Sequence, residues 1–176
     1  MLDVLRIAPL SSVQDSGREV WRALGVPRSG PLDEWSHAVA NVLVGNAPDA
    51  AALELGYGRT QLRFSAAALI AVSGARAPVQ IDGVAMPLWR PIVVAAGATL
   101  SLDPAQLGAR CYLAICGGVQ TPSVLGSRSA LLRQVGFPQP LQRGDSLRYA
   151  AAASAQWPGL RARVGRTSAA AALWAD

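Results

Sequence analysis

The chain has 176 residues, 51% of them apolar, which suffices for one globular domain with a core. All 16 Lys and Arg positions are arginines, so catalysis or phosphate binding by a lysine is excluded. The chain has one histidine and two cysteines, too few for a histidine-rich or a four-cysteine metal site. The net charge of +5 comes from arginines spread singly from Arg6 to Arg166, which lacks the clustered pattern of a nucleic-acid-binding surface.

Most of the chain divides into short apolar segments separated by Gly, Pro and Asp, which predicts β-strands. The candidates span residues 2–7, 60–64, 68–72, 79–81, 84–86, 91–94, 99–102, 109–115 and 146–149. Asp82-Gly83 lies between two of them, which is typical of a two-residue hairpin turn. Many short strands with frequent turns indicate a β-barrel or a β-sandwich.

One helix is predicted, from Pro31 to Val44, with acidic residues in its first turn and Gly45-Asn46 at its end. Its apolar stripe is expected to consist of Leu32, Trp35, Val39, Val42 and Leu43. Asp33, His37 and Asn41 follow one another at intervals of four, so they form a polar line on the opposite side. This line is either a solvated face, with His37 at the surface, or one wall of a polar cleft.

The character of the sequence changes after Tyr149, where an alanine-rich segment without apolar periodicity begins. We therefore expect a domain over residues 1–149, followed over 150–176 by an alanine-rich tail or the stub of a missing second half, with a short helix at about 168–174. Cys111 and Cys116 lie on one predicted strand, roughly 16 Å apart by the strand rise, which is too far for a disulfide. Buried, reduced thiols are expected.

Three loops combine an arginine, a hydroxyl and a glycine, at residues 13–18, 27–33 and 125–130. An arginine fork with nearby backbone N–H groups suits the oxygens of a carboxylate or a phosphate. Turns also favour Ser, Gly and Asp for structural reasons, and Arg18 could simply pair with Asp15. Each loop alone is therefore compatible with a ligand site or with an ordinary turn.

The loops and the segments between them form a longer series of motifs. It comprises Gln14-Asp-Ser-Gly-Arg18, Leu24-Gly-Val-Pro-Arg-Ser-Gly30 with Asp33, Ala40-Asn-Val-Leu-Val-Gly-Asn46, Ala52-Leu-Glu54, Ser73-Gly-Ala75, Gly108-Ala-Arg-Cys-Tyr-Leu-Ala114 with Gly117-Gly118, Gly126-Ser-Arg-Ser129 and Gly144-Asp145. Over residues 2–149 this series resembles the biotin-dependent carboxyltransferase-like family called allophanate hydrolase subunit 2, which includes the C subunit of 5-oxoprolinase.

The resemblance implies a mainly β, cyclophilin-like closed barrel with one main helix. It also implies a cytoplasmic, bacterial component of a heteromeric hydrolase that opens 5-oxoproline to glutamate, with a homologous B subunit and a separate A subunit as partners. ATP would be used by the complex, with no cofactor or metal bound directly by this chain. A carboxyltransferase component of a urea or amide carboxylase, with biotin on a separate carrier, is an alternative. No membrane span or secretory signal is expected, because no apolar run of about 18 residues occurs.

The resemblance also suggests the residues of a shared site. Asp33 or Glu54 would orient a water or the amide, although Glu54 could instead only pair with an arginine. The suggested substrate-binding residues are Gln14, Asp15, Arg18, Arg28, Ser29, Gly30, Asn41, Ser127, Arg128 and Ser129.

Three departures from the family pattern support a further alternative, a truncated binding or regulatory module without turnover. Members of the family usually have about twice this length, with a second cyclophilin-like half. Ala130 stands where the family commonly has Thr, and residues 135–141 replace a glycine-rich stretch.

Overall fold

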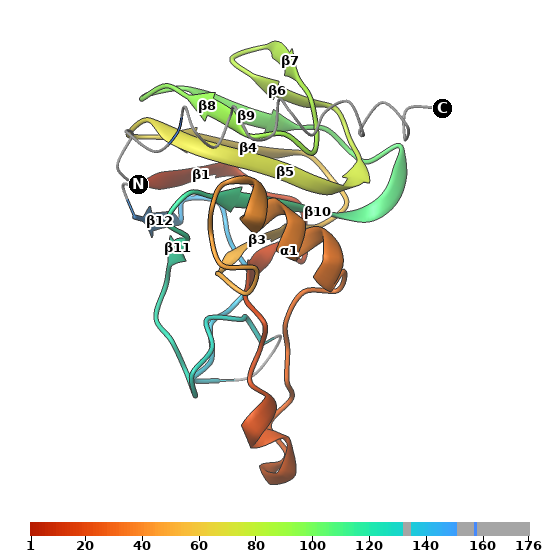
Figure 1. The fold of residues 1–176 in the computed structure, drawn as a ribbon, viewed down its shortest axis with the longest axis vertical. Coiled ribbons are helices and arrows are strands. Elements are labelled where there is room, and N and C mark those ends of the chain that lie inside the picture. Colours follow the sequence, from red (N-terminus) through yellow and green to blue (C-terminus); the bar gives the residue numbers. More distant parts are fainter. Residues whose placement is uncertain (132–134, 151–156, 158–176) are drawn as a thin grey trace.

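The computed structural model describes residues 1–131, 135–150 and 157 (Figure 1). This part of the chain is mainly β, which confirms the predicted class. It contains twelve strands in two antiparallel sheets and two short helices, η1 (Glu19–Leu24) and α1 (Glu34–Leu43). Figure 1 shows η1 at the tip of a long projection from the sheets.

One sheet has seven strands, in the order β11-β12-β1-β4-β9-β6-β7. Their bounds are β11 (Val119–Gln120), β12 (Ser146–Tyr149), β1 (Leu2–Arg6), β4 (Thr60–Phe64), β9 (Thr99–Leu102), β6 (Val79–Ile81) and β7 (Val84–Met86). The other sheet has five strands, in the order β2-β3-β10-β5-β8. Their bounds are β2 (Ser12–Gln14), β3 (Ala52–Leu55), β10 (Leu107–Ile115), β5 (Ala68–Arg76) and β8 (Ile92–Val94).

The main core lies between the two sheets. On β4, Thr60, Leu62 and Phe64 are buried while Gln61 and Arg63 are exposed, the alternation expected of a strand with one solvated face. The inward side chains of both sheets form one apolar cluster. Helix α1 covers the opposite face of the five-stranded sheet, where it contacts β3, β5 and β10. The central strands of that sheet are therefore buried on both faces.

The predicted closed barrel is not confirmed, because no ladder of hydrogen bonds joins the two sheets among the described residues. Single backbone hydrogen bonds connect their edges instead, such as that from Val119 N to Ala51 O, at 3.1 Å. The edge strands β2 and β11 have only three and two residues. Strands this short leave little backbone for a continuous ladder.

Helix α1 is shorter than predicted, and its burial differs from the predicted pattern at most positions. Asp33 is the N-cap and accepts a hydrogen bond from Ser36 N, so the helix begins at Glu34 and Pro31 precedes it. The side chains facing the sheet are Ser36, His37, Ala40, Asn41 and Val44. Of the expected apolar stripe, Leu32, Trp35 and Val42 are 72%, 68% and 56% exposed, whereas Leu43 packs against the cluster beneath the helix. The sheet beneath α1 carries Glu54, Ser73 and Tyr112, which require polar partners.

Several local predictions are confirmed. Strands β6 and β7 form the hairpin around Asp82-Gly83, and both turn residues have positive φ (48° and 81°), as a type I′ turn requires. Strands β4, β9 and β12 have the predicted bounds, whereas β5 and β10 extend to Arg76 and back to Leu107. Both cysteines are buried and unbridged, as expected.

Strands β2, β3 and β11 and helix η1 have no counterpart in the predictions. The three strands have two to four residues each, too few to show a period of two. The predicted helix at about 168–174, and all of the predicted tail except Ala150 and Trp157, lie outside the described residues. Neither described helix is long and apolar enough to span a membrane.

Candidate functional site

The three arginine-bearing loops, far apart in the sequence, meet in the structure. Ala130 N donates to Val13 O, and Arg18 N donates to Arg28 O, each at 2.9 Å. Gly30 N donates to the Gln14 side-chain oxygen at 3.1 Å. Ser29 Oγ donates to the carbonyl of Ala130. The loops thus form one connected frame at the base of the projection.

Asp15 is the centre of this frame. Its carboxylate accepts hydrogen bonds from Ser127 Oγ (2.5 Å), Arg128 N (2.6 Å), Ser129 Oγ (2.7 Å) and Gly17 N (2.9 Å). Burial alone would raise the pKa of Asp15, but these four donors outweigh it, so the pKa is lowered. The carboxylate is therefore occupied in holding loop 125–130 against loop 13–18.

The arginines of the frame make contacts within the protein. Arg18 is 2% exposed and donates to the carbonyls of Ser129 (2.7 Å), Ser127 (3.4 Å) and Val124 (3.3 Å). Arg128 Nη1 donates to the carbonyl of Thr121.

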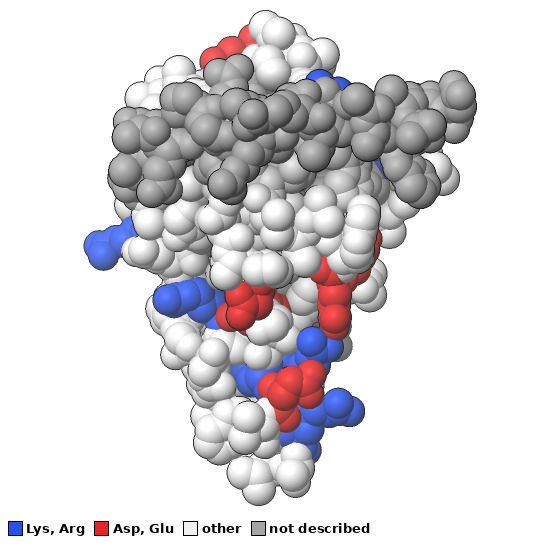
Figure 2. All heavy atoms as spheres, viewed as in Figure 1, with Lys and Arg blue, Asp and Glu red and all other residues white. Residues whose placement is uncertain are grey.

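Arg28 pairs with Glu19 and Glu34, at 2.5 Å each. Figure 2 shows these charges of both signs gathered on the projection that carries η1. The frame thus has the residues predicted for a site, but Asp15, Arg18, Arg28 and Arg128 already have partners within the protein.

His37 and Asn41 lie between α1 and the sheet. The expectation that His37 is a surface residue is wrong, because it is 2% exposed and its Nε2 lies 3.0 Å from Gln14 O. Burial lowers the pKa of His37, against smaller effects from Gln14, Asp15, Glu54 and Asp49 that raise it. Asn41 is fully buried and donates to Ala50 O at 2.8 Å, while its side-chain oxygen accepts from Asn46. His37 and Asn41 of the polar line therefore belong to a packed interface.

A cleft of about 440 Å³ lies at the start of α1, and we call it the α1 cleft. Its walls come from the helix start, β5 and β10, and its lining residues are Leu32, Asp33, Ser36, Gly74–Arg76 and Leu107–Arg110. It contains Asp33, one of the two predicted catalytic carboxylates, together with two arginines, Arg76 and Arg110. The cleft thus combines both signs of charge, as a site for a polar substrate requires.

A β-bulge shapes this cleft. Leu107 pairs with Arg76 and Cys111 pairs with Gly74, so three residues of β10 face only Ala75 on β5. Gly74 has φ +91°, and a Cβ there would collide with the carbonyl of Arg110. The bulge therefore depends on glycine at position 74. Arg110 lies two residues before Tyr112 on β10, so regular alternation places both on the helix side of the sheet.

Glu54, the second predicted catalytic carboxylate, lies next to Arg110 and is 7% exposed. Its Oε2 accepts from Leu32 N at 2.7 Å and from the Tyr112 hydroxyl at 2.9 Å. Its Oε1 lies 3.5 Å from Arg110 Nε. The pairing of Glu54 with an arginine, considered as an alternative from the sequence, is therefore present.

Tyr112 completes this group, because its hydroxyl also accepts from Asp33 N at 2.8 Å. Burial raises the pKa of Tyr112, and the negative charge of Glu54 raises it further against the hydrogen bond from Asp33. The phenol thus stays protonated and donates to Glu54. Arg76, Arg110 and Tyr112 were absent from the predicted site, since Arg110 and Tyr112 lie in a predicted strand and Arg76 lies just beyond one. Among the described residues, no three His, Cys, Asp or Glu side chains gather as a metal would require.

The family model of the carboxyltransferase domain, subdomain A and B, matches residues 24–174. The chain belongs to the carboxyltransferase domain family. This confirms the resemblance found in the motifs, and it places the α1 cleft and two of the three loops in the part of the chain that the family shares.

Individual carboxyltransferase relatives agree. The chain is 36% identical to the 5-oxoprolinase C subunit of Escherichia coli strain K12 over 133 residues, 76% of this chain and 43% of that protein. It is 32% identical to the 5-oxoprolinase C subunit of Haemophilus influenzae over 153 residues, 85% of this chain and 50% of that protein. The crystal structure of Kluyveromyces lactis urea carboxylase superposes with a TM-score of 0.81 at 34% identity, over 90% of this chain and 14% of that one. The chain thus spans about half the length of the 5-oxoprolinase subunits that it matches.

Proposed function

We propose that this chain is a component of an ATP-dependent complex that opens the lactam of 5-oxoproline to glutamate. It would form a shared site with a homologous B subunit, and an A subunit would act in the same complex. The observation that carries this proposal is the similarity to the C subunits of two 5-oxoprolinases, over 76% and 85% of the chain.

The chemistry of the chain supports a role that depends on partners. The chain has no lysine to bind a nucleotide phosphate, and its single histidine is buried against Gln14 O. Burial raises the pKa of the Cys111 thiol to about 11, which removes it as a nucleophile near neutral pH. ATP and the attacking group would therefore be handled mainly by the partner subunits.

The α1 cleft is the part of this chain that we assign to the substrate. A carboxylate of the substrate would bind the guanidinium groups of Arg76 and Arg110, which line the cleft. Asp33, at the cleft wall, would accept a hydrogen bond from the lactam N–H or from a water. Glu54 would act as a positioning residue, since it holds Arg110 at 3.5 Å and the backbone of Leu32 at 2.7 Å. The connected loops would keep this region in place beside the partner.

Replacement of Asp33 by Asn tests this assignment. Asn is a good N-cap, so the variant keeps the start of α1 and removes only the charge. In a complex reconstituted with the A and B subunits, we expect glutamate formation from 5-oxoproline to fall about 100-fold, a typical loss for a proton-handling group. Asp103→Asn, which removes an exposed partner of Arg59, is the matched control. A full rate with Asp33→Asn would remove Asp33 from the site.

Arg128 is tested in the same assay, because it belongs to the predicted substrate-binding set. Its guanidinium contacts the Thr121 carbonyl, so a purely structural role predicts a loss of stability with unchanged kinetic constants. If Arg128→Ala retained full activity at saturating 5-oxoproline and an unchanged KM, loop 125–130 would have a structural role and Arg128 would not contact the substrate.

A second candidate, the carboxyltransferase component of a urea or amide carboxylase, is favoured by the similarity to urea carboxylase. It would need a biotin carrier on another protein. Carboxyl transfer to urea in the presence of such a carrier, without cleavage of 5-oxoproline, would favour it. Tight binding to a homologue of the B subunit with neither activity would instead identify a binding module.

A further inference from the structure

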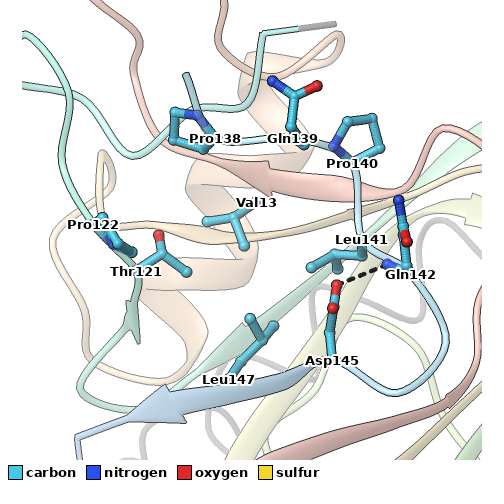
Figure 3. A pocket seen from close by; sticks show the side chains of 10 residues that line it. All are labelled: Val13, Thr121, Pro122, Pro138, Gln139, Pro140, Leu141, Gln142, Asp145 and Leu147. Carbon is cyan, nitrogen blue, oxygen red and sulfur yellow. Dashed lines mark hydrogen bonds between the residues drawn. The ribbon is translucent and has the colours of Figure 1, made fainter. Parts of the chain in front are cut away.

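A second cavity, of about 300 Å³, lies away from the α1 cleft, where the edges of the two sheets separate. Its floor consists of Val13 on β2, Leu147 on β12 and Leu141, which are all buried. Pro122, Pro138 and Pro140 line its walls. Figure 3 shows Thr121 and Pro122 on one side of this edge cavity and Gln142 with Asp145 on the other.

The edge cavity is pre-formed, because the segments around it are fixed. Leu141 N donates to Ser11 O at 2.8 Å, and Pro138 O accepts from Leu131 N at 2.9 Å. Val4 N donates to Asp145 O at 2.8 Å. Proline residues have a restricted backbone and no N–H group, so the walls present apolar surface that changes little on binding.

Two polar groups at this cavity can still take a partner. Thr121 Oγ1 is buried and makes no hydrogen bond within the described part of the chain. One oxygen of the Asp145 carboxylate accepts from Gln142 N at 2.8 Å, while no ion pair among the described residues involves Asp145. A carboxylate beside an apolar floor favours a cation, and a buried hydroxyl favours any polar group that can pair with it.

We propose that the edge cavity binds a primary ammonium group on a short apolar body, with the ammonium at Asp145 and the body on Val13, Leu141 and Leu147. The walls leave room for one small ring or one aliphatic chain. The same chemistry is offered by a free amine and by a lysine side chain of a partner protein. This site does not depend on the function proposed for the α1 cleft.

Cyclohexylammonium and the uncharged cyclohexanol are matched probes, since they share the ring and differ in charge. We expect saturable NMR shifts of the Thr121, Leu141 and Leu147 signals with cyclohexylammonium, and binding of cyclohexanol about tenfold weaker or more. Equal affinity for the two probes, or no saturable shift of these signals, would overturn the proposal. This comparison uses the unmodified chain and does not depend on any variant.

Asp145→Asn tests the role of the carboxylate, because the amide oxygen of Asn can still accept from Gln142 N. We expect cyclohexylammonium binding to weaken about tenfold or more, with cyclohexanol binding unchanged. Asp103→Asn is the control for a surface charge. Unchanged cyclohexylammonium affinity in Asp145→Asn would contradict the assigned contact.

N-acetyl-lysine methylamide distinguishes the two sources of the ammonium. Tighter binding than cyclohexylammonium would assign the edge cavity to a lysine of a partner protein, whereas weaker binding would assign it to a small free amine. Failure of both compounds to bind would overturn the proposal.

Discussion

At the scale of single residues, the group around Glu54 shows how a buried carboxylate is retained. Glu54 receives two hydrogen bonds and an ion pair, from Leu32 N, the Tyr112 hydroxyl and Arg110. A buried charge without such partners would be strongly destabilising. The same contacts fix the backbone at the start of α1, so one residue links the sheet, the helix and the α1 cleft.

Tyr112→Phe is expected to destabilise the protein by about 1–3 kcal/mol, because it leaves Glu54 without one donor and Asp33 N without its acceptor. Urea denaturation followed by circular dichroism measures this difference. Tyr57→Phe, at a tyrosine that is 63% exposed, is the control and should change stability little. An equal, small effect for both variants would show that the hydroxyl of Tyr112 contributes nothing.

At the scale of elements, α1 shows that its amphipathic pattern alone does not define which face is buried. Its large apolar residues Trp35 and Val42 are exposed, while Ser36, His37 and Asn41 contact the sheet. Ser73 Oγ donates to Ser36 O at 2.6 Å, so the helix is attached by specific polar contacts as well as by Ala40 and Val44. Trp35 packs on Trp89 at a centroid distance of 5.4 Å outside this interface.

The buried His37 makes the packing of α1 sensitive to pH. Burial lowers its pKa below the ordinary 6.5, so the unfolded chain binds a proton more readily than the folded one. The contribution to stability is therefore complete above about pH 6.5 and decreases as the pH falls through the folded pKa.

We expect the unfolding free energy of the protein to decrease more steeply below about pH 6.5 than that of His37→Gln, in which nothing titrates at this position. Parallel pH profiles of the two proteins would contradict this expectation.

At the scale of the whole molecule, the two sheets share one core although they do not close into a barrel. Phe64 from the seven-stranded sheet and Cys111 from the five-stranded sheet belong to the same apolar cluster. Two sheets packed on a common core are expected to unfold together.

Phe64→Ala should cost about 3–5 kcal/mol, because the side chain is fully buried. The buried Cys111 thiol can be labelled only in molecules that have unfolded. If the two sheets unfold together, the loss of unfolding free energy in Phe64→Ala should therefore raise the labelling rate of Cys111 in proportion to the larger unfolded population. Mass spectrometry of the labelled peptide reports the rate, and Val84→Ala, at a residue that is 60% exposed, is the control. A destabilised protein with an unchanged rate at Cys111 would mean that the sheets open separately.

Features that depend on neighbouring residues could be read from the sequence. The alternation of β4, the Asp82-Gly83 hairpin and the end of α1 shortly before Gly45 follow from local backbone preferences, which act over a few residues. The motif series likewise identified the carboxyltransferase family and the three loops that meet around Asp15.

Features that depend on long-range contacts required the tertiary structure. The buried face of α1 depends on Glu54, Ser73 and Tyr112, which lie on three strands distant in the sequence. The role of Arg110 depends on Glu54, which the pairing of β3 with β10 brings beside it. A polar side chain is buried or exposed according to the partners that the fold brings to it, and no local pattern contains that information.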